Sequence, residues 1–133
     1  MFRTQSTVNV PIAAGAVAPL ELAQINTPGG AFTLNGDGTV TVNQAGIYQV
    51  DARIQAAADG SFQVFVNGAQ PSVLNGGAVP TAAGGTAIIP TILTLNAGDV
   101  ISIVNGGNVA SSLLGVFDGL ITANTALRII KLD

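Results

Sequence analysis

The chain has 133 residues and a net charge of −3, and 48% of its residues are hydrophobic while only 8% are charged. Its four cations give no electrostatic footprint for nucleic acid. The absence of cysteine excludes disulfides and thiolate metal sites, so the redox compartment cannot be inferred. Mean hydropathy is +0.56, but prolines and glycines interrupt every long apolar stretch, so we expect no membrane insertion.

The scarcity of charge predicts self-association. A chain of this length is one domain and buries a core without help. Charged residues are typically about a quarter of a soluble domain, and an obligate oligomer needs fewer because its interfaces resemble a domain core cut in half. We therefore expect a subunit whose faces are covered by other subunits.

Residues 1–19 predict an extended N-terminal arm, followed by one domain over residues 20–133. Thr7 to Val10 alternate, and Pro11, Gly15 and Pro19 exclude a helix. Two interpretations stay open: the arm packs on its own domain as a first strand, or it adds as a strand to a neighbouring subunit. In the second, the contacts are made by Val8, Val10 and Ile12. No basic region followed by an unbroken apolar one marks a secretory signal.

Residues 20–25 form a short run that is compatible with a strand or with a helix of one or two turns. Residues 31–34 begin the next predicted strand, and Asn35-Gly36-Asp37-Gly38 follows as a tight turn. Oxygen-rich loops also bind calcium, but the twelve-residue ligand spacing is absent here. The simpler interpretation is that these four residues are there because they form a tight turn.

The clearest strand covers residues 46–55. Tyr48, Val50, Ala52 and Ile54 share one face, and the residues between them are polar. This period of two predicts a half-buried antiparallel strand, with the Tyr48 hydroxyl bonded at the rim of the core.

Asp51 and Arg53 lie two residues apart on the polar face of this strand. They either belong to a solvated strand face or form an ion pair between subunits. Such a pair would fix how the two subunits align more than it would stabilise them.

Residues 61–66 form the next predicted strand, which Asn67-Gly68 closes as a two-residue hairpin turn. Phe62, Val64 and Val66 should face the core. Phe65 points the other way and lies either in a subunit interface or in solvent.

The remaining chain is predicted as a loop over residues 71–85 and strands over 86–95, 100–104 and 126–132, with 113–114 and 120–121 flanking a short loop. Residues 86–95 are apolar on both faces, as in a strand covered on both sides, and Pro90 argues for a sheet edge or a bulge. Short strands with turn signals about every 8–12 residues indicate an all-β antiparallel sandwich. Sparse aromatics and the doubly apolar strand favour a jelly roll that oligomerises.

Several motifs in residues 30–133 match one known group in order and spacing. They are Val42 with Gly46-Ile47-Tyr48, Phe62-x-Val64-x-Val66-Asn67-Gly68, Leu95-Asn96-Ala97-Gly98-Asp99-Val100, and the final strand at Ile129 to Leu132. They resemble the jelly rolls of tumour necrosis factor and the complement globular heads. The closest likeness is to the C-terminal domains of collagen-like exosporium glycoproteins of spore-forming bacteria. The resemblance implies a homotrimer on a cell, spore or virion surface, with Ile130 in a final strand beside the trimer axis. The collagen repeat is absent.

Enzymatic function is not expected. The chain has no His, no Cys and a single lysine, Lys131, and its aspartates are scattered, mostly beside turn glycines. We expect no catalytic residue, no metal and no cofactor.

The first functional hypothesis is a structural protein that self-assembles as trimers, filaments or both into a bacterial spore or cell-surface layer or appendage. Its assembly contacts are predicted at the arm and at Asp51, Arg53, Phe65 and Ile130. The alternative is a phage head-fibre, decoration or receptor-binding head on a virion.

Overall fold

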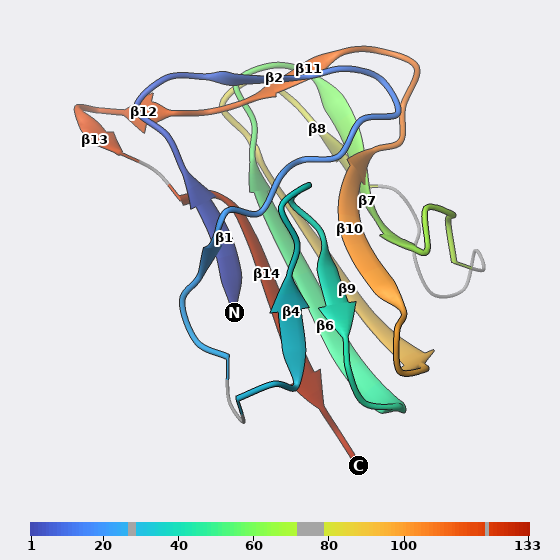
Figure 1. Cartoon of the computed structure of the whole chain (residues 1–133). Helices are drawn as coiled ribbons and strands as arrows, with labels where there is room; N and C mark the ends of the chain where they lie inside the picture. The colour runs from blue at the N-terminus through green and yellow to red at the C-terminus, as the bar shows by residue number, and fades with distance from the viewer. Residues whose placement is uncertain (27–28, 72–78, 122) are drawn as a thin grey trace.

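The computed structural model describes residues 1–26, 29–71, 79–121 and 123–133 (Figure 1). The described residues form β-strands and turns and contain no helix, so none is available to cross a membrane. All strand pairs are antiparallel. The predicted all-β jelly-roll class is confirmed.

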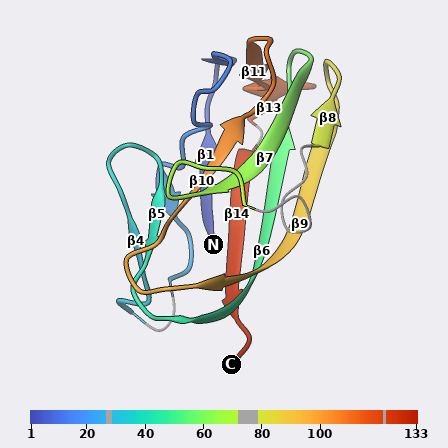
Figure 2. The same cartoon turned by 90° about the vertical axis from the view of Figure 1, so that its right-hand side faces the viewer.

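Two five-stranded sheets face each other (Figures 1 and 2). The first sheet has the order β3 (Leu22–Ala23), β1 (Phe2–Gln5), β14 (Ala123–Lys131), β6 (Gly46–Gln55), β9 (Thr86–Leu95). The second sheet has the order β4 (Phe32–Leu34), β5 (Val40–Val42), β10 (Val100–Asn105), β7 (Gly60–Val66), β8 (Val79–Thr81). Two short pairs lie at one end: β2 (Val10–Ile12) with β11 (Ser111–Leu113), and β12 (Val116–Phe117) with β13 (Leu120–Ile121).

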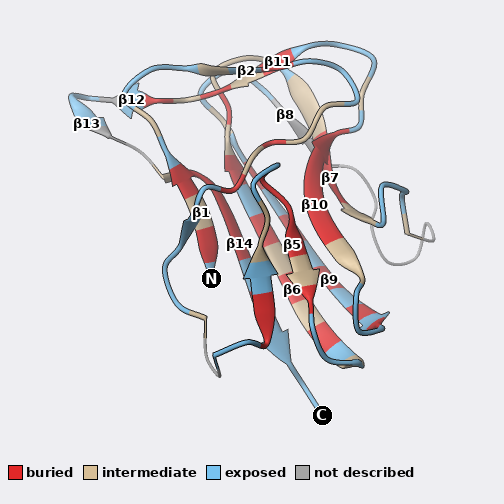
Figure 3. Cartoon of the chain, in the orientation of Figure 1, coloured by how far each residue is buried: buried red, intermediate tan, exposed pale blue. Residues whose placement is uncertain are grey.

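The core fills the space between the two sheets (Figure 3). The predicted apolar face of β6 is confirmed, because Tyr48, Val50, Ala52 and Ile54 are all buried. Burying one large aliphatic side chain contributes roughly 1.5–3 kcal/mol, so this alternation alone fixes which face of β6 is inside. The Tyr48 hydroxyl donates to the Gln44 carbonyl at 2.7 Å, as expected at the rim.

The N-terminal residues are part of the sandwich. Strand β1 lies between β3 and β14, with Phe2 opposite Leu127. Further along, β2 pairs with β11, and the backbone of residues 15–18 bonds to β10. Packing on its own domain is therefore what the structure shows for this segment, and a free arm is not seen.

The run at residues 20–25 contains a strand, β3, and not a helix, because Leu22 and Ala23 pair with Arg3 and Phe2. The predicted loop over 71–85 is described only in part, since residues 72–78 lie outside the described residues. Its later part contains β8, which pairs with Gly60 to Phe62.

Two tight turns have the backbone that a two-residue hairpin needs. Asn67 and Gly68 both have positive φ, and Val66 and Ala69 exchange backbone hydrogen bonds, so this predicted turn is confirmed. Asp118 and Gly119 have the same pair of positive φ values between β12 and β13, as a type I′ turn requires.

Candidate assembly surface

The outer face of the first sheet carries an apolar patch. Along β9, buried and exposed residues alternate strictly, so the outward-facing Ile88 and Ile92 are 60% and 59% exposed. Strand β9 is the sheet edge that Pro90 predicts, but it is not covered on both sides within one chain. Its sequence is that of a doubly covered strand, which points to a second covering from outside.

Strand register places two other exposed isoleucines on the same face of the sheet. Ile92 lies opposite Gln49 of β6, and Gln49 in turn lies opposite Ile130 of β14. Ile47 at the start of β6 is also exposed. Ile47, Ile88, Ile92 and Ile130, called here the isoleucine face, therefore spread over three adjacent strands.

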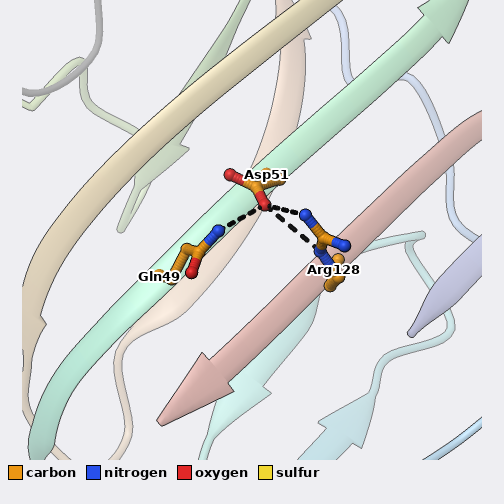
Figure 4. A network of polar contacts seen from close by, with 3 residues as sticks. All are labelled: Gln49, Asp51 and Arg128. Atoms are coloured by element: carbon orange, nitrogen blue, oxygen red, sulfur yellow. Dashed lines mark hydrogen bonds and ion pairs between the residues drawn. The ribbon is translucent and has the colours of Figure 1, made fainter. Parts of the chain in front are cut away.

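A polar network crosses the isoleucine face (Figure 4). Asp51 Oδ2 accepts from Arg128 Nε at 3.2 Å and Nη2 at 2.5 Å, and from Gln49 Nε2 at 2.8 Å. The Asp51 side chain is 16% exposed and that of Arg128 57%. A carboxylate that accepts three donors is held in one orientation, so the network is fixed before any partner arrives.

The predicted interface residues do not all meet. Asp51 is paired with Arg128 of its own chain, while Arg53 donates to the Ala123 carbonyl and to Gln55. Ile130 lies on the same face, but Phe65 lies on β7 in the second sheet and is half-buried.

Arg128 is the functional candidate that sequence reasoning missed. Residues 51 and 128 are far apart in the chain, and only the pairing of β14 with β6 places them opposite each other. The signal was the presence of two cations in a last strand of a chain that has only four.

The three predicted contact residues of the arm differ from one another in how far they are buried. Ile12 is buried in the core of its own chain, Val10 is partly buried against it, and Val8 is exposed. Ile12 is therefore not available to a neighbouring subunit in this structure, because its side chain is packed in the core.

The Asn35–Gly38 turn uses its oxygen atoms internally. Asp37 Oδ1 accepts from the hydroxyl and the backbone N–H of Thr39, at 2.6 and 3.1 Å. These two hydrogen bonds lower the pKa of Asp37. Among the described residues, no group of three or more possible metal ligands comes together.

No family model matches the sequence, and no curated protein matches it. Solved structures do resemble it. The Eiger TNF of S. frugiperda is 17% identical, with a TM-score of 0.70 over 99% of this chain and 90% of that one. The globular domain of a zebrafish complement 1qA protein is 9% identical, with a TM-score of 0.61 over 99% and 96%. Rabbit GITRL is 15% identical, with a TM-score of 0.58 over 94% and 93%.

These likenesses define the class of fold. The chain is a jelly roll of the kind found in TNF ligands and complement globular heads, which confirms the broader resemblance seen in the sequence.

Proposed function

We propose that the chain is a non-enzymatic structural subunit that self-assembles as a homotrimer through the outer face of its first sheet. The isoleucine face is the single observation that carries this function. One exposed isoleucine is ordinary on a protein surface, but four exposed isoleucines on one face of three adjacent strands indicate an interaction site. The low overall charge supports the same conclusion.

The polar network gives the proposed interface its register. Mutual attraction of a buried ion pair is offset by desolvation, so such a pair adds specificity more than stability. A hollow of about 200 Å³ beside Arg128, lined by Arg53, Ile88 and Ala126, offers a neighbour's side chain a place to insert.

We place the assembly on the surface of a bacterial spore or cell, as a layer or appendage. The sequence likeness to exosporium glycoproteins supports this location, and the jelly-roll fold is compatible with it. The proposed partner is another copy of the chain, with no cofactor and no nucleic acid.

Replacing both Ile88 and Ile92 by Asp tests the interface. The wild-type chain should elute in size-exclusion chromatography with light scattering at about 40 kDa, three times its 13.2 kDa. The double variant should elute as a folded monomer, because carboxylates cannot be buried unpaired against a neighbour.

Val109→Asp is the control, since Val109 is at least as exposed as Ile88 and Ile92 but is not part of the isoleucine face. It should remain trimeric. A wild-type monomer, or a double variant that still forms trimers, would contradict the proposal.

A further inference from the structure

The hairpin formed by β12 and β13, residues 116–121, stands apart from both sheets. Within the described chain its two strands pair only with each other, and it projects at one end of the molecule (Figures 1 and 2). Its Leu120 is 72% exposed and Val116 is exposed as well. A small apolar hairpin in solvent is costly, which suggests that something covers it.

A groove lies at the opposite end, where β14 finishes and β6 begins. Its volume is about 460 Å³, within the range of binding cavities. Ile25, Phe32, Tyr48 and Ile129 form much of its wall, and Lys131 stands at its edge. Figures 1 and 2 show that β14 runs from the hairpin end to this end of the molecule.

The groove also contains an unpaired strand edge. Strand β1 pairs with β14 only as far as Phe2 opposite Leu127, and no described strand continues on that side. Leu132 N–H donates to Ile47 of β6. Because antiparallel residues alternate between their two neighbours, the backbone groups of Ile129 and Lys131 point to the open side.

The charges of the two surfaces are complementary. Asp118 lies in the turn of the hairpin, where its positive φ is tolerated. Arg128 and Lys131, half of the chain's cations, line the groove. Each has a carboxylate neighbour in its own chain, Asp51 and Asp133, so the complementarity steers the contact and apolar burial stabilises it.

We propose that the β12–β13 hairpin of one copy docks in this groove of a second copy. Leu120 enters the apolar groove, and an outer edge of the hairpin pairs with the free backbone groups of Ile129 and Lys131, a strand addition. The two surfaces lie at opposite ends of one molecule, so the contact is head-to-tail. Contacts of this kind that do not close into a ring produce filaments.

This inference rests on the proposed self-assembly and extends it. The groove shares Arg128 and Ile130 with the isoleucine face, but Leu120 and Ile25, the residues changed below, belong only to the end-to-end contact. It assigns the contact between copies to the hairpin, whereas one interpretation of the sequence assigned a strand addition to Val8, Val10 and Ile12 of the arm. The trimer and the end-to-end contact can therefore fail separately.

Two single variants and their mixture test it. Leu120→Asp disables the hairpin, and Ile25→Asp disables the groove; both side chains are exposed, so the fold is retained. The wild-type chain should form end-to-end species that grow with concentration in sedimentation velocity, and each variant alone should lose them. Mixed together, the two variants should form one complex, because an intact hairpin of one meets an intact groove of the other.

The complex in the mixture should hold two trimers if the isoleucine face trimerises, and two single chains if it does not. The mass of the complex therefore tests the trimer separately from the end-to-end contact. Val109 lies in the segment between β10 and β11, outside both the hairpin and the groove, so Val109→Asp should assemble like wild type. Absence of end-to-end species in the wild type, wild-type assembly by Leu120→Asp, or no complex in the mixture would each overturn the inference.

Discussion

At the scale of single residues, the pair formed by Asp51 and Arg128 reports whether the isoleucine face is covered. An exposed ion pair contributes about 0–1 kcal/mol. Removing one partner of a buried pair costs roughly 3–5 kcal/mol, because it leaves an uncompensated charge. The two situations differ enough to be measured.

We expect Arg128→Met to lower the free energy of unfolding of the assembled protein by about 3 kcal/mol, because the proposed trimer interface would bury Asp51. Urea unfolding at fixed protein concentration gives this value. Arg53→Met, which removes a cation that has no carboxylate partner among the described residues, should change it by much less. A loss near zero for Arg128→Met would mean that the face stays in water.

Tyr48 predicts how stability depends on alkaline pH. Burial, and secondarily the negative charge of Asp133, raise its pKa above the ordinary value near 10. The folded chain therefore keeps the phenol proton that the unfolded chain releases. The stabilisation is complete below pH 10 and is lost as the pH rises through the folded pKa.

Tyr48 is the only tyrosine and the chain has no tryptophan, so phenolate absorbance reports this residue alone. We expect its titration midpoint to lie higher in the folded protein than in urea. Tyr48→Phe should flatten the alkaline fall in Tm. Coincident midpoints in the two states would contradict the assignment.

At the scale of elements, the turn between β4 and β5 places two glycines in contrasting positions. Gly38 has a φ of +83°, and a Cβ there would meet Pro19 Cα at 2.6 Å. Gly36, two residues earlier, has no positive φ and nothing within 4 Å of the Cβ position. Only Gly38 is required by the backbone.

We expect Gly38→Ala to destabilise the chain by more than about 1 kcal/mol, since alanine at positive φ is strained. Gly36→Ala in the same turn should be close to neutral. Thermal unfolding of both variants compares them directly, and equal Tm values would show that the backbone of Gly38 is not restrained.

The sequence predicted correctly those elements that depend on a short stretch of neighbouring residues. The face of β6 followed from the alternation at Tyr48 to Ile54, and the Asn67-Gly68 turn followed from residues that tolerate positive φ. Strand β8 was missed, and the run at residues 20–25 was left open between a strand and a helix. Both β8 and β3 are too short to show a period and form only by pairing with their neighbours.

The candidate site was predicted less completely than the fold, for the same reason. Asp51 was identified on the polar face of its strand, but its partner Arg128 is 77 residues away. The isoleucine face combines residues from β6, β9 and β14 that no stretch of sequence brings together. Strand order is a property of the whole chain, and a single sequence does not state it.

For the whole molecule, the position of β14 has a consequence for biosynthesis. This strand lies inside the first sheet, between β1 and β6, although it comes after all the other described strands in sequence. During translation β1 has no partner in the sheet interior until residue 127 has left the ribosome, because Phe2 pairs with Leu127. Strand β6 meanwhile presents an open apolar edge, the kind of surface on which nascent chains aggregate. The first sheet is therefore completed only after residues 123–131 have been synthesised, and production of this protein depends on keeping its unfinished form apart from other unfinished copies.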